Sequence, residues 1–442
     1  MPDLMDKIVS LCKRRGFIFP SSEIYGGFGS GYDFGPLGVE MKNNIKAAWW
    51  KEMIRIQKNI VGLDSAILMS PQVWQASGHL TAGFADELVE CKKCHHRFRK
   101  DFLEKNNCPD CGGELTESRK FNLMMKTFIG PVEDETATAY LRAETCQGIY
   151  LNFLNVLNSC RLKIPFGIAQ IGKAFRNEIT TKNFIFRTRE FEQMEMQWFC
   201  PPAKADEFFE YWKEARMKWY LNLGIKKENL RFKEVAKSEL AHYAKKAVDI
   251  EYKFPFGWQE IEGIHNRGDW DLSNHSKHSG QELKYLDEET KEKYFPYIIE
   301  TSAGADRSFL AFLVDAYQEV KGGRSETTQA VKEEEVVLKL DKRLSPIKLA
   351  VLPLVKNKPA LVEKAKEVYQ LLKPHFVCQY DEVGSIGRRY RRMDEAGTVF
   401  CLTLDFESLD NDDLTVRDRD TMSQERIKID RLVVFLKEKL DE

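Results

Sequence analysis

The chain has 442 residues, of which 43% are hydrophobic and 31% charged, and its formal net charge at pH 7 is -1. At about 100–200 residues per domain, this length indicates roughly two to four domains. The near-neutral charge excludes a protein that coats nucleic acid through its bulk charge, although local basic faces can still bind RNA. No stretch approaches the roughly 18 apolar residues of a membrane span, and residues 1–6 lack the basic start of a signal peptide. We therefore expect a cytoplasmic protein whose ten cysteines are mostly reduced.

The N-terminal part begins with an expected helix and a short extended piece over residues 1–20, then a glycine-rich stretch over 21–38 and a helix over about 39–58. The chain contains neither a dinucleotide-binding fingerprint nor a P-loop, which excludes two common nucleotide-binding interpretations. The patterns that follow predict a polar insertion over 86–120, a helix over 140–165, and two strands joined by a polar loop over 166–200. An amphipathic helix over 205–223 and extended segments over 254–272 and 294–304 come next. The last element of this part is a helix over about 305–321, which Gly322 and Gly323 end.

Residues 324–345 are charged and poor in aromatic residues, which indicates a linker with some added strand. Strands and helices then alternate, which predicts a compact α/β domain of the parallel type. The predicted strands cover 348–354, 376–380 and 398–404, and the predicted helices cover 359–372, 384–396 and 423–440.

Two neighbouring strands carry the most informative pattern in the chain. Residues of one parity share a face of a strand. In a strand over 167–178, this face carries small residues that leave room above the sheet and ends in two charged residues: Gln170, Gly172, Ala174, Arg176 and Glu178. In a strand over 184–199, one face carries two cations, an aromatic ring, an amide and an anion: Arg187, Arg189, Phe191, Gln193 and Glu195.

This side-chain set suits nucleotide activation. Arginines bind phosphate oxygens and oppose the charge that develops at phosphorus. Phe191 offers a flat surface for a purine ring, and a glutamate can accept a hydrogen bond from its exocyclic amine. The alternative is a solvated sheet face with cross-strand salt bridges, which the small residues and the matched second strand disfavour.

The same segments resemble motif 2 of the class II aminoacyl-tRNA synthetases, namely Phe175-Arg176-Asn177-Glu178 and Phe186-Arg187-Thr188-Arg189-Glu190-Phe191-Glu192-Gln193-Met194-Glu195. The ending Phe-Glu-Gln-Met-Glu resembles the glycyl enzymes in particular. Segments similar to motif 1, to motif 3 and to further parts of the glycyl enzymes are Gly35-Pro36-Leu37-Gly38, Gly304-Ala305-Asp306-Arg307, Leu141-Arg142-Ala143-Glu144-Thr145 and Glu300-Thr301-Ser302-Ala303-Gly304. The similarity covers residues 1–440.

The resemblance implies an α+β fold with a class II antiparallel-sheet catalytic domain over 1–325, which contains the cysteine-rich insertion 86–120. A linker over 326–344 and a C-terminal α/β anticodon-binding domain over 345–442 would follow. It implies an enzyme that activates glycine with ATP and Mg²⁺ and loads it onto tRNA(Gly), as a homodimer built on motif 1, with neither DNA nor a membrane as partner. In such a domain we favour RNA contact over a solvated helix face for the basic run 387–392.

Roles in ATP binding follow from the resemblance residue by residue. Arg176 would hold the α-phosphate, Arg187 the outer phosphates, and Glu178 the adenine amino group. Phe191 would stack on adenine, with Arg307 on the other side reaching the γ-phosphate, and Arg176 and Arg307 are the catalytic pair. Glu260 resembles the acidic Mg²⁺ ligand before motif 3, which suits the oxygen chemistry of this ion. Further expected ATP contacts are Asn177, Phe186, Thr188, Arg189, Glu190, Ile261, Gly304, Ala305 and Asp306.

Glycine requires acceptors for its ammonium group and a filled space where a side chain would be. Glu144, Glu195 and Ser302 resemble the glycine-binding set of the family, and Arg99 resembles a substrate contact. The alternative for Glu144 is a helix-surface carboxylate in a salt bridge. Further expected glycine contacts are Phe191, Glu192, Gln193, Met194, Glu300, Thr301, Ala303 and Gly304.

Four cysteines form two C-x2-C knuckles separated by thirteen residues: Cys91, Cys94, Cys108 and Cys111. This spacing suits a closed tetrahedral zinc site with a structural role. The alternative is a set of reduced surface thiols. We interpret Asn274-His275-Ser276-Lys277-His278 as a polar loop without metal.

Two rival functions remain open at this point. One is a class II synthetase for proline, threonine, serine or histidine, which the acidic pocket for a small substrate disfavours. The other is a non-catalytic relative with the same fold, which would have no need of the ATP ligands Arg176, Glu178, Arg187 and Arg307.

Overall fold

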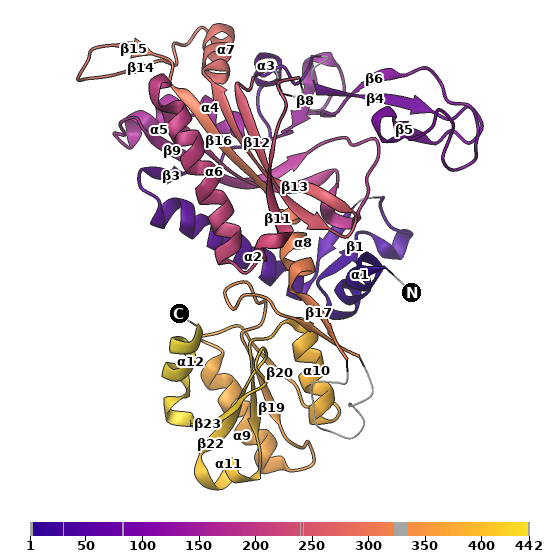
Figure 1. Cartoon of the computed structure of the whole chain (residues 1–442), viewed down its shortest axis with the longest axis vertical. Coiled ribbons are helices and arrows are strands. Elements are labelled where there is room, and N and C mark those ends of the chain that lie inside the picture. Colours follow the sequence, from indigo (N-terminus) through magenta and orange to yellow (C-terminus); the bar gives the residue numbers. More distant parts are fainter. Residues whose placement is uncertain are drawn as a thin grey trace.

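A seven-stranded sheet forms the centre of the larger of two lobes in this computed structural model (Figure 1). The strand order is β11-β12-β13-β16-β10-β9-β3, and neighbouring strands are antiparallel except β3 and β9. In that order the strands span Leu230–Glu234, Lys246–Phe254, Gly257–Gly268, Tyr297–Gly304, Glu190–Cys200, Phe166–Phe175 and Ile60–Gly62. The structure describes residues 3–29, 31–81, 84–238, 240–241, 243–321 and 334–440.

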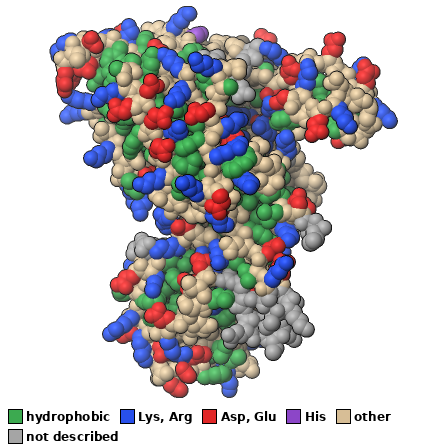
Figure 2. Space-filling view, viewed as in Figure 1, with side chains coloured by type: hydrophobic (Ala, Val, Ile, Leu, Met, Phe, Trp, Pro, Cys, Tyr) green, Lys and Arg blue, Asp and Glu red, His purple; other side chains and the backbone are tan. Residues whose placement is uncertain are grey.

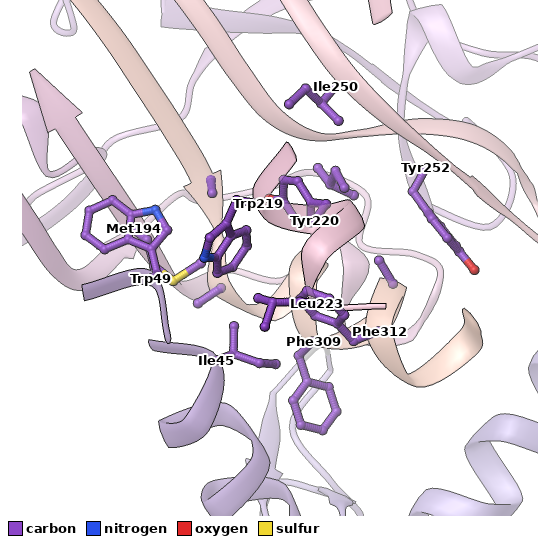
Figure 3. Close-up of a cluster of buried hydrophobic side chains, with 14 of the residues drawn as sticks. Ile45, Trp49, Met194, Trp219, Tyr220, Leu223, Ile250, Tyr252, Phe309 and Phe312 are labelled. Atoms are coloured by element: carbon purple, nitrogen blue, oxygen red, sulfur yellow. The ribbon is translucent and has the colours of Figure 1, made fainter. Parts of the chain in front are cut away.

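Three helices pack on one face of this sheet: α2 (Pro36–Trp50), α6 (Ala205–Asn222) and α8 (Ala305–Ala316). Because successive strand residues point to opposite faces, Met194, Met196 and Trp198 of β10 are buried against these helices. The helices contribute Ile45, Trp49, Trp219, Tyr220, Phe309 and Phe312 (Figure 3). Burial of each large side chain stabilises the lobe by about 1.5–3 kcal/mol, so this face holds the main core.

The opposite face is covered in part by α4 (Cys146–Leu151), α5 (Phe153–Ser159) and α7 (Trp270–Ser279). There Phe153 packs on Phe166 and Phe199. Further along β10 the residues on this face change from apolar to polar, at Gln197, Glu195 and Gln193. The apolar cover therefore ends in front of a row of polar side chains.

The cysteine-rich insertion is a small three-stranded sheet of order β5-β4-β6 that projects from the larger lobe (Figure 1). Its strands span Arg97–Arg99, Ala85–Glu90 and Arg119–Asn122. The other elements of this lobe are α1 (Leu4–Arg15), β1 (Ile18–Pro20), β2 (Tyr32–Phe34), the π-helical turn Lys51–Ile56, α3 (Pro71–Ala76), β7 (Met125–Phe128), β8 (Thr138–Leu141), β14 (Tyr285–Leu286), β15 (Lys293–Tyr294), β17 (Tyr317–Val320) and β18 (Glu335–Leu338).

The smaller lobe contains a five-stranded sheet of order β20-β19-β21-β22-β23 with its own apolar core. β19 is parallel to β20 and β21, whereas β21, β22 and β23 are antiparallel. The strands span Cys378–Tyr380, Leu349–Pro353, Phe400–Leu404, Asp413–Asp418 and Gln424–Lys428. The helices are α9 (Pro359–Leu372), α10 (Ile386–Ala396), α11 (Phe406–Asn411) and α12 (Leu432–Leu440).

Several predicted elements differ from the structure, each because tertiary pairing overrides the local pattern. Residues 140–165 contain the end of β8 and two short helices, α4 and α5, in place of one helix. α8 ends at Ala316, because the chain then pairs as β17 with β18. Residues 423–440 divide into β23 and α12, and the unpredicted β22 makes the smaller sheet mixed in direction. The predicted stop at Gly322 and Gly323, the linker up to residue 333 and the boundary at 325 lie outside the described residues.

Side chains of both charge signs are interspersed over the visible face of both lobes, as the near-zero net charge suggests (Figure 2). Within the described parts of the chain, none of the helices has the length and apolar character that a membrane crossing needs.

Candidate active site

A cavity of about 280 Å³ lies on the polar part of the sheet, between β9, β10, β13 and β16 and the loop that joins β9 to β10. Charged and polar groups supply most of its wall. It is lined by Glu144, Arg176, Glu178, Ile185, Phe186, Arg187, Thr188, Phe191, Glu192, Gln193, Glu195, Tyr243, Asp249, Glu260, Gly263, His265, Glu300, Ser302, Gly304, Asp306 and Arg307. The structure thus brings residues from segments far apart in sequence into one wall.

Arg176 lies just beyond the end of β9, because the strand ends at Phe175, three residues before the predicted end at residue 178. Its main-chain N–H donates to the carbonyl of Arg189 at 2.9 Å, and its Nε donates to the carbonyl of Ala143 at 3.1 Å. The guanidinium lies 5.4 Å from the ring centre of Phe191. These contacts orient Arg176 while its charged end faces the cavity.

Two further arginines pair with carboxylates. Arg187 Nη1 lies 3.2 Å from Glu178 Oε2, and Arg307 Nη1 lies 3.1 Å from Glu260 Oε2. Arg307 also lies over the ring of Phe186, 4.5 Å from its centre. Each guanidinium therefore has a partner that an anionic ligand would have to replace.

Helix α2 reaches the site through two lysines that the sequence reasoning missed. Lys42 Nζ lies 2.6 Å from Asp306 Oδ1 and 3.0 Å from Glu192 Oε2, and Lys46 Nζ lies 3.1 Å from Glu192 Oε1. Burial raises the pKa of Glu192, but Lys42 and Lys46 outweigh it and hold this pKa below its ordinary value. Asp306 in turn accepts from the main-chain N–H of Glu192 at 2.9 Å. The lysines thus join the segments resembling motifs 1, 2 and 3.

Glu195 lies at the deep end of the cavity and is 2% exposed. Its Oε1 accepts from Ser302 at 2.7 Å and from Gln193 at 3.2 Å, and its Oε2 accepts from Thr145. Burial and the negative charges of Glu300 and Glu144 raise the pKa of Glu195 to about 7. An ammonium group placed here would relieve that repulsion.

Glu144 lies beside it, buried in front of α4, which disfavours the alternative of a helix-surface carboxylate. Its Oε1 accepts from Gln147 Nε2 at 2.8 Å and from Cys146 Sγ at 3.0 Å, and lies 3.4 Å from His79 Nε2. Burial raises the pKa of Glu144, but His79 outweighs this effect, so the pKa lies well below its ordinary value. Glu144 is therefore ionised near neutral pH.

Glu300 also lines the cavity, but neighbouring groups engage both of its oxygens. Oε1 lies 2.9 Å from His265 Nδ1, and Oε2 accepts from Arg267 and Gln197 at 3.0 Å each. Arg267 is buried and also pairs with Asp271 of α7 at 2.7 Å. This network holds Glu300 in place in the wall of the cavity.

The room that small residues were expected to leave above β9 is partly filled. A Cβ on Gly172 would lie 2.2 Å from Arg142 Nη2. Arg142 is buried there and donates to the carbonyls of Lys173 and Ser65 at 2.6 and 2.8 Å. Gly172 thus accommodates a structural arginine from the protein itself.

Some predicted site residues do not line the cavity with their side chains. Asn177, Arg189 and Glu190 lie near its rim, in and beside the loop that joins β9 to β10. Arg99 lies in the insertion, paired with Asp86 at 2.9 Å and Asp101 at 2.7 Å. The side chains of the remainder are buried in the sheet or in α8: Ile261, Met194, Thr301, Ala303 and Ala305. Any contact of this last group with a ligand would come from the main chain, and its part in binding stays a prediction.

Five lining residues had escaped the sequence reasoning: Ile185, Tyr243, Asp249, Gly263 and His265. Burial and the charge of Glu260 raise the pKa of Asp249 to about 6. Asp249 interrupts the apolar run Ala247, Val248 and Ile250 of β12, and this interruption was the available sign in the sequence. Tyr243 and His265 had no comparable signal.

The four knuckle cysteines come together in the insertion, with all four sulfur atoms within 4.8 Å of one another. Cys91 and Cys111 Sγ are 3.5 Å apart, and Cys94 and Cys108 Sγ are 3.6 Å apart. Four sulfurs at about 2.3 Å from one ion would lie about 3.8 Å apart, so the cluster fits a tetrahedral metal. A Cβ on Gly113 would lie 3.0 Å from Cys91 Sγ, so this site also needs its glycine.

The basic run of α10 is mostly engaged within the protein. Arg389 is buried and donates to the carbonyls of Pro353 and Leu354. Arg391 pairs with Glu335, and Arg392 with Asp381. Arg388 is exposed. The expected RNA-contacting patch is therefore smaller than the sequence indicated.

The comparisons with known proteins agree with this architecture. The tRNA synthetase class II core domain (G, H, P, S and T) matches residues 128–317, and an anticodon binding domain matches residues 348–439. The glycine–tRNA ligase of Treponema denticola is 55% identical over 98% of this chain and 96% of its own length. The glycine–tRNA ligase of Thermobifida fusca is 51% identical over 99% of this chain and 98% of its own length. The glycine–tRNA ligase of Borreliella burgdorferi is 54% identical over 98% of this chain and 97% of its own length.

These matches confirm the predicted α+β class II fold and set aside both rival functions, because the similarity to glycine–tRNA ligases extends over nearly the full chain. The chain belongs to the glycine–tRNA ligase family of class II aminoacyl-tRNA synthetases.

Proposed function

We propose that this glycine–tRNA ligase binds ATP and glycine together in the cavity on the open face of its sheet, and there forms glycyl-adenylate before transfer to the 3′ end of tRNA(Gly). The observation that carries this proposal is the presence of two opposite sets of charges in one cavity. Arg176, Arg187 and Arg307 suit a triphosphate, and Glu144 and Glu195 suit an ammonium group.

For ATP, we assign Arg176 to the α-phosphate, Arg187 to the outer phosphates, and Arg307 to the γ-phosphate and one face of adenine. Phe191 would cover the other face of the ring. Glu178 pairs with Arg187 and Glu260 with Arg307, so phosphate oxygens would compete with these carboxylates for the two guanidinium groups. Release of Arg187 would leave Glu178 available to accept from the adenine amine.

For glycine, we assign the ammonium group to Glu144 and Glu195, with Ser302 holding Glu195 at 2.7 Å. The glycine carboxylate then attacks the α-phosphorus in line, and the bond to pyrophosphate breaks. The terminal ribose hydroxyl of the tRNA next attacks the carbonyl, and AMP leaves. No side chain acts as a nucleophile, so catalysis consists of alignment and stabilisation of charge.

The cavity also suits the Mg²⁺ that class II synthetases use with ATP. Glu260 and Asp249 lie on adjacent strands and both line the cavity. Burial and the charge of Glu260 raise the pKa of Asp249, and a divalent cation between the two carboxylates would relieve this repulsion. We assign both carboxylates to the ion, which neutralises phosphate charge when bound.

We assign zinc to the four cysteines of the insertion. The sulfur spacing and the glycine at position 113 support this assignment. A four-sulfur site has no open position for a substrate, so its role is structural.

We assign tRNA recognition to both lobes, with the anticodon on residues 345–442, and assembly to a homodimer. Supporting the dimer, the loop before β2 exposes Ile24, Tyr25 and Phe28 to 87%, 86% and 67%. Apolar exposure of this kind is typical of an interface. Sedimentation of the full chain at micromolar concentration tests the assembly.

An amino-acid-dependent pyrophosphate exchange panel tests the central proposal. We expect exchange with glycine and none with alanine, serine, proline or threonine. Arg176→Ala should abolish exchange and leave the thermal unfolding curve intact, because Arg176 lies on the cavity wall and not in the core. Exchange within about tenfold of the parent enzyme, a barrier change of only about 1.4 kcal/mol, would overturn its assignment to the α-phosphate.

A further inference from the structure

Helix α7 carries a buried histidine that no part of the proposed chemistry uses. His275 lies in the segment expected to be a polar loop, but the structure makes it helical and leaves the side chain 4% exposed. Its Nε2 lies 2.7 Å from Oε1 of Gln147 on α4. Gln147 is itself 0% exposed, and its Nε2 donates to Oε1 of Glu144 at 2.8 Å.

The Glu144 carboxylate at one end of this chain of hydrogen bonds determines which atom of each pair donates. An ionised carboxylate only accepts, so the amide nitrogen of Gln147 must face Glu144, and its amide oxygen must face His275. His275 must then carry its proton on Nε2. Burial lowers the pKa of His275, which keeps the ring neutral and leaves it a single N–H for this bond.

The three donors to Glu144 all reach the same oxygen. Gln147 Nε2, Cys146 Sγ and His79 Nε2 lie 2.8, 3.0 and 3.4 Å from Oε1. Oε2 accepts from none of these three groups. One oxygen is thus anchored from behind, while the carboxylate lines the cavity.

We propose that His275 is a positioning residue for glycine: through Gln147 it anchors one oxygen of Glu144 and leaves the other for the ammonium group of the substrate. This inference rests on the proposed role of Glu144. Without the N–H of His275, the amide oxygen of Gln147 loses its buried partner, so the Gln147 side chain is held less firmly and its hydrogen bond to Glu144 weakens. The carboxylate would then be held less firmly in its binding position on the glycine side of the cavity.

Glycine-dependent pyrophosphate exchange on the full chain tests this directly. For His275→Leu we expect KM for glycine to rise about tenfold and KM for ATP to stay within about twofold, since about 1.4 kcal/mol of hydrogen bonding is lost on the glycine side alone. His275→Gln places an amide N–H where Nε2 was and should restore KM for glycine. His275→Asn has the same chemistry but not the reach, so it should resemble His275→Leu. His278→Leu changes an exposed histidine of the same helix and should leave both constants unchanged.

A double-mutant cycle separates positioning from packing. Gln147→Met should raise KM for glycine by itself, and adding His275→Leu should change it little further, because both changes break one chain of bonds. Equal loss in His275→Gln and His275→Leu, full activity in His275→Asn, or a parallel rise in KM for ATP would each overturn the inference.

Glu144→Gln separates the proposed role of Glu144 in binding glycine from the proposed role of His275 in positioning Glu144. A raised KM for glycine in Glu144→Gln, together with an unchanged one in His275→Leu, would overturn the role of His275 and support that of Glu144. An unchanged KM for glycine in Glu144→Gln would overturn the role of Glu144 and, with it, this inference.

Discussion

At the scale of single residues, Glu195 and Glu144 have the same side chain but opposite protonation behaviour. Burial, Glu300 and Glu144 raise the pKa of Glu195 to about 7 from its ordinary value of 4.5. Burial also acts on Glu144, but there His79 outweighs it and keeps that carboxyl ionised. Near neutral pH, Glu195 is therefore the one of the two that titrates.

This difference predicts how glycine binding depends on pH. The ammonium group favours ionised Glu195, so the glycine complex holds fewer protons than the free enzyme, and binding strengthens as pH rises through the pKa of Glu195. Between about pH 6 and about pH 8 the ionised fraction rises about tenfold, so KM for glycine in pyrophosphate exchange should fall about tenfold and then level. KM for ATP, measured in the same assays, provides the internal control.

Glu195→Gln removes the titrating group from this experiment. Its KM for glycine should be high and independent of pH over the same range. A pH dependence that persists in Glu195→Gln would show that another group is responsible.

At the scale of elements, helix α2 is fitted closely against the turn that follows α1. The main-chain N–H groups of Leu37 and Gly38 donate to the carbonyl of Gly16 at 3.0 and 3.4 Å, which satisfies donors that a helix start leaves unpaired. A Cβ on Gly38 would lie 1.9 Å from the carbonyl oxygen of Phe17. The obstacle is main chain, which cannot swing aside as a side chain can.

We therefore expect Gly38→Ala to lower the free energy of unfolding by about 1–3 kcal/mol, as overpacking typically does. Urea denaturation followed by circular dichroism measures this. Gly29→Ala is the matched control, because a Cβ there meets nothing within 4 Å. Equal stability of Gly38→Ala and the parent would show that the contact relaxes without cost.

The cysteine-rich insertion is a second element that can be tested, through the metal content of its four-cysteine site. We expect purified chain to contain about one zinc ion, and Cys91→Ser and Cys111→Ser each to lose it, because a closed site needs all four thiolates. Elemental analysis provides the measurement. Cys160→Ser, an exposed cysteine outside the cluster, should keep the metal. Unchelated chain without zinc would contradict the assignment.

At the scale of the whole molecule, two separate cores meet at a short connection. Leu338, Leu340 and Leu344 pack in the core of the larger lobe, whereas Leu349 begins the core of the smaller one. Glu395 of α10 contacts Arg14 and Arg15 of α1 at 3.1 and 2.6 Å, which links the lobes at their surface. The change of core between residues 344 and 349 supports the proposed start of the anticodon-binding domain at 345.

We expect a chain that ends at Leu344 to keep glycine-dependent pyrophosphate exchange and to lose most tRNA charging. The cavity residues all precede the cut, and the removed lobe is the one matched by the anticodon binding domain. Within the full chain, Arg388→Glu should lower charging and spare exchange, because this arginine is exposed on α10. Normal tRNA charging by a folded truncated chain would contradict the assignment of anticodon recognition to residues 345–442.

The sequence by itself determined the chemistry and much of the order of elements. Period-two alternation placed Phe191, Gln193 and Glu195 on one face, and all three line the cavity. The pattern also predicted α9 from Pro359 to Leu372 with its observed bounds. Spacing of the four cysteines predicted a cluster, which the fold assembles. These features are local, so short windows of sequence contain the information.

Only the tertiary structure decided which distant groups meet. Lys42 on Asp306, His79 on Glu144, and Arg142 in the space beside Gly172 join segments that no local pattern connects. The same holds for His275. Its segment is polar, as a loop would be, but in the structure the segment is helical and His275 is buried by packing against α4. The physical reason is that burial, pairing and pKa depend on what lies nearby in space, and proximity in space is set by the packing of the whole sheet and its helices.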